Sequence, residues 1–221
     1  MALYKMKKKL IKRIYTSIIL LSLLFLMMIN NFILAYFLII AGVLSILEFS
    51  KIILLILPKK KIKQLSINIL FTIYILFFCS IFVFFSNFLY LKILIFIILL
   101  TCVASDVGGF IFGKIFKGPR LTKISPNKTY SGSLGSLILS STVISLLIYY
   151  LTKNFSINIL LIGCITSISC QIGDLFFSFL KRKSLLKDTG NLLPGHGGIL
   201  DRVDGILFGM PIGFATLLIM Y

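Results

Sequence analysis

Long apolar stretches, each close to the length of a bilayer-crossing helix, alternate in this chain with short clusters of lysine and arginine. Hydrophobic residues make up 59% of its 221 residues. A helix needs about 20 apolar residues to cross the hydrocarbon core of a membrane, and only helices and closed barrels satisfy their backbone there. The pattern therefore predicts an all-α, polytopic integral membrane protein.

We expect about seven transmembrane helices, within a range of six to nine. The expected spans are about 14–30, 32–50, 66–86, 88–105, 133–151, 157–180 and 205–221. Asn30 and Asn31 predict a tight turn between the first two spans, and Pro58 predicts the end of the second. The chain contains no linker or internal repeat, so residues 1–221 are expected to form a single membrane domain.

The net charge of +17 is carried by clusters that fall between the spans. These clusters lie at 5–13, 59–63, 114–128 and 181–202. Cytoplasmic loops of membrane proteins carry an excess of lysine and arginine, and placing the N-terminus in the cytoplasm puts all four clusters on that side. Topology thus explains most of the charge, and we expect no nucleic-acid partner. Anionic lipid headgroups are a secondary partner for the same charges.

Scarce polar residues gather between positions 178 and 204. The chain has six acidic residues and one histidine, and this stretch holds the histidine and three of the acidic residues. Gly195, Gly197 and Gly198 flank His196, and because glycines have no side chain, a bound group could approach the backbone there. Such a concentration beside apolar helices indicates a site for phosphate and metal. About 106–132 is the other polar segment with room for chemistry.

Three aspartates are the candidate metal ligands. Asp201 and Asp204 are three residues apart, so on a helix they share a face, and Asp174 could complete the site from another helix. Carboxylates at the edge of the hydrocarbon are costly and usually functional. Oxygen ligands that leave room for water and phosphate suit Mg²⁺. Glu48, alone in its region, is expected to pair with Lys51 and is given no catalytic role.

The earlier polar segment contains Ser125-Pro126-Asn127-Lys128-Thr129 ahead of Ser131-Gly132-Ser133. A lysine beside hydroxyls, leading into a helix N-terminus, is typical of an anion-cradling loop. Ser-Pro-Asn is also an ordinary turn, and the glycines nearby could equally serve close helix packing. The motif is not a Walker A loop, because the required order of glycine, lysine and hydroxyl is absent.

The polar stretch near the C-terminus contains a long run of specific residues: Ser178, Leu180, Lys181, Arg182, Lys187, Asp188, Gly190, Leu193, Pro194, His196, Gly197, Gly198, Ile199, Asp201, Arg202, Val203 and Asp204. This run resembles the signature of the phosphatidate cytidylyltransferases (CDP-diacylglycerol synthases). Upstream, Ser105-Asp106, Gly108-Gly109, the run at 125–129 and Gly173-Asp174 follow in the expected order. One departure is Tyr130-Ser131-Gly132, where many relatives have Trp-Glu-Gly, so an acidic contact is missing.

The resemblance implies transfer of the cytidylyl group of CTP to phosphatidate, giving CDP-diacylglycerol and pyrophosphate. It further implies Mg²⁺, with a second, monovalent cation left open, and a homodimer in a bacterial inner membrane with its active site facing the cytoplasm. The N-terminal helices would occupy 1–100 and the catalytic portion about 101–210. The implied catalytic residues are Asp174, Asp201, Asp204 and Lys187, and the three aspartates are the implied metal ligands. The implied substrate-binding residues are Ser125, Asn127, Lys128, Lys181, Arg182, Asp188, His196, Gly197, Gly198 and Arg202.

Two other functions stay open at this point. One is another CTP-dependent lipid transferase, such as a polyprenol or phytol kinase. The second is a non-catalytic membrane protein that binds an anion with its charged inner face. A CDP-alcohol phosphatidyltransferase is excluded, because that family needs further aspartates and nothing acidic follows Asp204.

Overall fold

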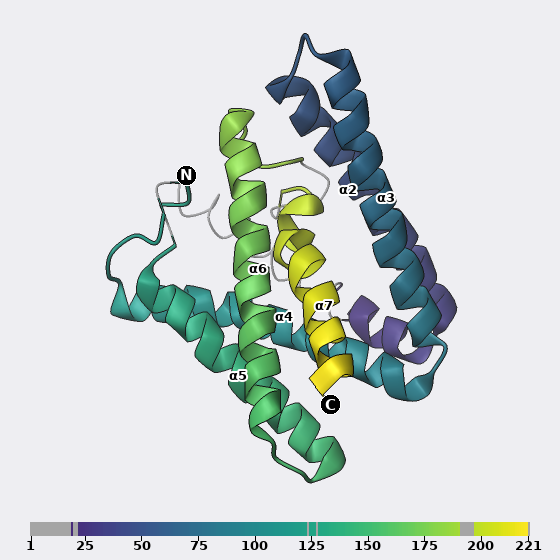
Figure 1. Ribbon diagram of the computed structural model, residues 1–221, viewed down its shortest axis with the longest axis vertical. Helices are drawn as coiled ribbons and strands as arrows, with labels where there is room; N and C mark the ends of the chain where they lie inside the picture. The colour runs from purple at the N-terminus through teal and green to yellow at the C-terminus, as the bar shows by residue number, and fades with distance from the viewer. Residues whose placement is uncertain (1–18, 20–21, 123, 127, 191–196, 221) are drawn as a thin grey trace, which may run out of the picture. The chain divides into compact units, whose positions relative to one another are not determined.

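The computed structural model describes residue 19 and residues 22–122, 124–126, 128–190 and 197–220 (Figure 1). Its helices are α2 (Asn31–Ile56), α3 (Lys61–Ser86), α4 (Leu89–Phe116), α5 (Tyr130–Thr152), α6 (Ile157–Lys183) and α7 (Leu200–Met220). All six are long and apolar enough to cross a membrane, and the described ranges contain no strand beyond an isolated bridge. The prediction of an all-α, multi-pass membrane protein is confirmed.

The predicted helix ends differ most at α4. Residues 22–29 are helical, and the remainder of the predicted span 14–30 lies outside the described residues except for residue 19. Asn30 caps α2, its side chain accepting the Phe32 N–H. Helix α4 continues eleven residues beyond the predicted end at 105 and stops before Lys117 and Gly118, which have φ of 51° and 110°. Asp106 therefore lies within a helix and not in a polar loop.

The described residues pack as two compact units. The first comprises those of Met1–Phe88 and Lys183–Arg202, and the second those of Leu89–Arg182 and Val203–Tyr221. In the first unit, α2 packs on α3 with the rings of Phe49 and Phe71 stacked, their centroids 3.9 Å apart. The prediction of a single membrane domain stays a prediction.

Glycines bring the helices of the second unit into close contact. A Cβ on Gly108 of α4 would lie 2.5 Å from the carbonyl oxygen of Gly135 on α5. A Cβ on Gly163 of α6 would lie 2.6 Å from the Cα of Ser141. Small residues serve this purpose in membranes, where packing drives helix association because water is absent. The packing interpretation of Gly108 and Gly135 is thus confirmed.

Helices α6 and α7 lie side by side in the same way (Figure 1). A Cβ on Gly173 would meet the Asp204 carbonyl oxygen at 2.6 Å, and one on Gly205 would meet Asp174 Oδ1 at 2.7 Å. Each glycine is adjacent in sequence to one predicted metal ligand, Asp174 or Asp204, and lies close in space to the other. The close approach of the two helices therefore sets how near the Asp174 and Asp204 carboxylates can come.

Candidate functional site

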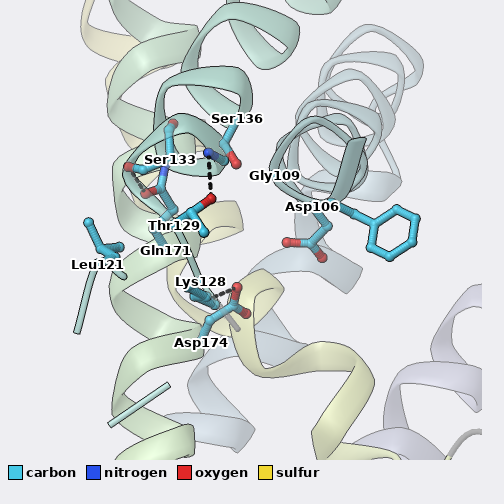
Figure 2. Close-up of a pocket in the computed structure, with 11 residues that line it drawn as sticks. Asp106, Gly109, Leu121, Lys128, Thr129, Ser133, Ser136, Gln171 and Asp174 are labelled. Carbon is cyan, nitrogen blue, oxygen red and sulfur yellow. Dashed lines mark hydrogen bonds and ion pairs between the residues drawn. The ribbon is translucent and has the colours of Figure 1, made fainter. Parts of the chain in front are cut away.

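A pocket opens in the second unit between α4, α5 and α6 (Figure 2). Its volume is about 290 Å³. It is lined by Asp106, Gly109, Phe110, Leu121, Lys128, Thr129, Gly132, Ser133, Ser136, Gln171 and Asp174. The pocket thus contains carboxylate, ammonium, hydroxyl and amide groups, although the helices around it are apolar. Ligand-binding pockets commonly combine apolar walls with a few polar groups in this way.

The loop between α4 and α5 brings Lys128 to this pocket. Leu121 donates its N–H to the Lys128 carbonyl at 2.7 Å, and Arg120 forms an isolated antiparallel bridge with Thr129. The loop therefore folds back on itself as a narrow hairpin, with the Lys128 N–H bonded to the Ser125 carbonyl at 3.1 Å. Backbone contacts thereby hold three of the loop's predicted residues, Ser125, Lys128 and Thr129, and Asn127 lies outside the described residues.

The shortest ion pair of the pocket joins this loop to α6. Lys128 Nζ lies 2.7 Å from Asp174 Oδ2, and both side chains are partly exposed. Figure 2 shows the two groups facing each other, with the Asp106 carboxylate directed into the same space. The prediction that Lys128 and Asp174 belong to one site agrees with this geometry. Their separation of 46 positions gives no hint of it in the sequence.

Helix α5 begins at the pocket wall. Thr129 is its N-cap, and the hydroxyl accepts the Gly132 N–H at 3.1 Å. The Tyr130 N–H donates to the Pro119 carbonyl at 3.2 Å. Two of the N–H groups that a helix start leaves unpaired therefore have partners within the protein. The dipole of the helix still favours negative charge at this end, and Lys128 supplies a full positive charge.

Sequence reasoning missed Gln171 and Ser136, which together with Ser133 make part of the pocket wall polar. Ser133 donates its hydroxyl to Gln171 Oε1 at 2.6 Å, and the Gln171 amide nitrogen lies 3.3 Å from the Ser133 carbonyl. Ser136 donates to the Ser105 carbonyl at 2.7 Å. Gln171 and Asp174 are three residues apart on α6, so they share a helix face. That spacing is the one sequence signal that would have marked Gln171 as part of the site.

The Asp204 carboxylate has both an ion-pair partner and negatively charged neighbours in the second unit. Asp204 lies in α7, where its side chain is 3.8 Å from Lys181 Nζ and accepts the Gly205 N–H at 3.0 Å. The negative charges of Asp174 and Asp106 repel that of the Asp204 carboxylate. Within the described ranges, no three His, Cys, Asp or Glu side chains are close enough to form a ready-made metal cage. Mg²⁺ commonly uses one or two carboxylates and completes its shell with water and phosphate.

The signature segment supplies a hydrogen-bonded cluster in the first unit. Asp201 lies in the first turn of α7, and its Oδ2 accepts the N–H groups of Thr189 at 2.8 Å and Gly198 at 3.1 Å. Gly197 has a φ of 85°, which explains why a glycine is needed there. A Cβ on Gly197 would lie 3.1 Å from the same Asp201 oxygen. The glycines thus let the backbone wrap the Asp201 carboxylate.

Glu48 has a different environment from the one predicted. It lies in α2, is only 2% exposed, and accepts hydrogen bonds from Thr189, Ile199 and Leu200. Among the described residues these are its hydrogen-bond partners, and Lys51 is exposed on the helix surface. The expected Glu48–Lys51 pair is therefore wrong. Its true partners lie more than 140 positions away, so local spacing could not reveal them.

The remaining predicted residues fall into three groups. Ser125 is half-buried in the loop before α5. The predicted residues that are exposed are Arg182, Lys187, Asp188 and Arg202. His196 lies outside the described residues. The structure thus brings Lys128 together with Asp174 and Lys181 together with Asp204 in the second unit, and groups Gly197, Gly198 and Asp201 in the first.

Comparison with known proteins matches the chain to one family of enzymes. The profile of the cytidylyltransferase family matches residues 1–220. A phosphatidate cytidylyltransferase of Rickettsia typhi (strain ATCC VR-144 / Wilmington) is 41% identical over 128 residues, which cover 53% of this chain and 56% of the relative. One of Mycobacterium leprae (strain TN) is 38% identical over 127 residues, covering 57% of this chain and 41% of the relative.

A third relative, the phosphatidate cytidylyltransferase of Staphylococcus haemolyticus (strain JCSC1435), is 44% identical over 110 residues. That match covers 49% of this chain and 42% of the relative. The chain thus spans about half the length of the curated relatives it matches.

Proposed function

The chain belongs to the cytidylyltransferase family, and we propose that it transfers the cytidylyl group of CTP to phosphatidate, giving CDP-diacylglycerol and pyrophosphate. The observation that carries this proposal is the Lys128–Asp174 pair, 2.7 Å apart in a pocket between membrane helices. The relatives named as phosphatidate cytidylyltransferases support the identity of both substrates.

The reaction brings two anionic groups together. A phosphate oxygen of phosphatidate attacks the α-phosphorus of CTP, a new P–O bond forms, and the bond to the β-phosphate breaks to release pyrophosphate. An ionised phosphate needs no general base, so the protein's task is to position the reactants and compensate their charge. Lys128 lies in the pocket, and its ammonium can leave Asp174 for a substrate phosphate. Lys181 offers a second cation near Asp204.

The residues of the second unit fit a divalent cation. Asp174 and Asp204 can offer oxygen ligands, and the negative charges of Asp174 and Asp106 repel that of Asp204, which a bound cation would relieve. We propose that Asp174 and Asp204 hold Mg²⁺, which when bound polarises the phosphates and neutralises the departing pyrophosphate. The role of Asp201 as a further ligand stays a prediction, as does a second, monovalent cation.

The membrane setting suits a lipid substrate. The apolar surfaces of α4 and α5 include exposed Phe110, Leu134 and Ile138, which are suited to contact hydrocarbon. We propose that the acyl chains of phosphatidate stay in the bilayer while its headgroup enters the pocket. Cytoplasmic placement of the site in a bacterial inner membrane is supported by the basic clusters between the spans. A homodimer stays a prediction.

A direct test is turnover by the purified full chain in detergent or lipid. We would incubate it with CTP, phosphatidate and Mg²⁺, and identify CDP-diacylglycerol by mass spectrometry alongside pyrophosphate release. Both products should form in equal amounts, require phosphatidate, and disappear with EDTA. Pyrophosphate release without phosphatidate would contradict the proposed acceptor. No product from monodisperse protein would leave an anion-binding membrane protein as the better account.

A further inference from the structure

A second, buried carboxylate holds the signature segment. Glu48 Oε1 accepts the Ile199 N–H at 3.1 Å, and Oε2 accepts the Leu200 N–H at 2.9 Å. Oε2 also accepts the Thr189 hydroxyl at 2.6 Å. All these residues belong to the first unit. A carboxylate on α2 thus binds both the segment before α7 and the first N–H of α7 itself.

This arrangement accounts for a buried charge that would otherwise be costly. Charged groups removed from water need hydrogen bonds or ion pairs, and Glu48 has three donors. Helix α7 begins at Leu200, so the carboxylate also lies at the positive end of the helix dipole. Because the first N–H groups of a helix have no partner within it, Glu48 supplies an acceptor that the helix lacks.

Thr189 connects Glu48 to Asp201. Its hydroxyl oxygen lies 2.6 Å from Glu48 Oε2 and 3.1 Å from Asp201 Oδ2. A hydroxyl has a single hydrogen to donate, and the shorter distance assigns it to Glu48. The Thr189 backbone N–H then donates to Asp201 at 2.8 Å. One residue therefore binds both carboxylates, each through a different donor.

Two glycines leave the space that Glu48 occupies. A Cβ on Gly190 would lie 2.6 Å from Glu48 Oε1, and a Cβ on Gly198 would overlap with Glu48 and with the Thr189 hydroxyl. Both glycines belong to the signature segment. The approach of Glu48 thus leaves no room for a side chain at these two positions of the segment.

We propose that Glu48 is a positioning residue, which fixes the start of α7 and, through Thr189, the carboxylate of Asp201. It acts on the reaction through these residues and does not contact the reacting atoms. The catalytic consequence rests on the function proposed above, whereas the structural consequence does not. Residues that orient a ligand or a catalytic carboxylate typically change activity by about 10- to 100-fold when they are replaced.

Glu48→Gln is the sharpest variant. It preserves shape but replaces one acceptor oxygen with an NH₂ group, which would face either the Ile199 N–H or the Leu200 N–H, so at least one bond is lost. Glu48→Asp keeps the charge on a shorter side chain and should restore part of the effect. Ser45→Ala is the matched control, because Ser45 is buried on the same helix nearly one turn earlier.

Two readouts are needed on the full chain in detergent. Amide hydrogen exchange at Thr189 and Gly198, which bind Asp201, and at Ile199 and Leu200 should be about ten-fold faster in Glu48→Gln. The kcat of transfer should fall about ten-fold or more, while the KM for phosphatidate stays within about two-fold. Glu48→Asp should be intermediate, and Ser45→Ala should match the wild type in both.

Wild-type kcat in Glu48→Gln would overturn the proposal, even with a lower Tm, because the residue would then be structural only. Unchanged exchange at the four amides would also overturn it. If the wild type does not transfer cytidylyl at all, the proposed function fails, and the exchange at Thr189 and Gly198 still decides whether Glu48 positions Asp201. Should Glu48→Gln not fold, Thr189→Val against Thr189→Ser tests the same link, with loss of kcat expected only in the valine variant.

Discussion

The two carboxylate-rich regions of this chain are held in opposite ways. In the second unit, Asp174 and Asp204 are paired with the ammonium groups of Lys128 and Lys181. In the first unit, Glu48 and Asp201 accept hydrogen bonds from backbone N–H groups and one hydroxyl. Lysine pairs on flexible side chains can exchange for a substrate phosphate, whereas backbone donors cannot move without unfolding the segment.

We infer that this difference separates the residues proposed to bind substrate phosphates from those proposed to position a helix. The Lys128–Asp174 ion pair lines a pocket of about 290 Å³. An anionic ligand that replaces Asp174 beside Lys128 forms a new ion pair, which compensates for the one that is lost. A buried carboxylate bound by N–H groups instead defines where a helix begins. Substitutions of the ion-paired side chains in the second unit should therefore change turnover with little effect on stability, and those of the hydrogen-bonded groups in the first unit should change stability as well.

The largest effect is expected for Asp174→Asn. Loss of the carboxylate removes the Lys128 partner and a proposed metal ligand, so kcat should fall on the order of 10³-fold. The Tm should stay within about 2 °C, because the substitution also relieves repulsion from Asp204. Turnover with labelled CTP and a thermal melt in detergent measure both. A large fall in Tm with retained turnover would reverse the assignment of the two regions.

Lys128→Met should lower kcat/KM for CTP by about 10²-fold, because it removes the cation of the pocket and leaves Asp174 unpaired. Lys128→Arg keeps the charge and should recover most of this loss. Initial rates over a range of CTP concentrations provide the comparison. Equal kcat/KM in the methionine variant and the wild type would mean that substrate phosphate does not use this lysine.

Gly198→Ala probes the first unit through stability. Its Cβ would overlap with Thr189 and Glu48, and such overpacking costs about 1–3 kcal/mol. The Tm should fall clearly. Gly113→Ala is the matched control from the second unit, since its Cβ would lie 3.1 Å from the nearest atom, the Thr129 hydroxyl oxygen. A control variant that melts as low as Gly198→Ala would mean that the overlap with Thr189 and Glu48 does not determine the loss of stability.

The smallest effect is expected for Lys181→Gln. Its Nζ lies 3.8 Å from Asp204, a looser contact than the 2.7 Å pair of Lys128. We expect turnover to be about five-fold lower, because a five-fold change corresponds to about 1 kcal/mol, the energy of a single weak ion pair. The same CTP assay tests it. A loss as large as that of Lys128→Met would make Lys181 an equal partner in phosphate binding.

The lengths of the apolar runs in the sequence determined which helices could be predicted. Helices α5, α6 and α7 were placed within a few residues, because apolar runs bounded by polar clusters define them. The end of α4 was missed because Asp106 and the following glycines were interpreted as a loop. Gly118-Pro119, just beyond the helix end, was the available stop signal.

The candidate site was predictable in composition but not in pairing. The signature segment identified Asp201, Asp204 and Lys181, yet no spacing rule connects Lys128 with Asp174 or Glu48 with Thr189. These contacts depend on how separate helices pack. A lone buried acid such as Glu48 was assigned to its nearest lysine, although a carboxylate in an apolar helix more often has a specific distant partner.

The most direct test of cytidylyl transfer is the fate of the individual phosphorus atoms of CTP. Purified protein would receive phosphatidate, Mg²⁺ and CTP labelled at either the α- or the γ-phosphorus. We predict that the α-label enters the lipid and the γ-label leaves with pyrophosphate, and that Asp174→Asn strongly reduces both. Transfer of the γ-label to a lipid would contradict this account, because it would make the protein a CTP-dependent kinase.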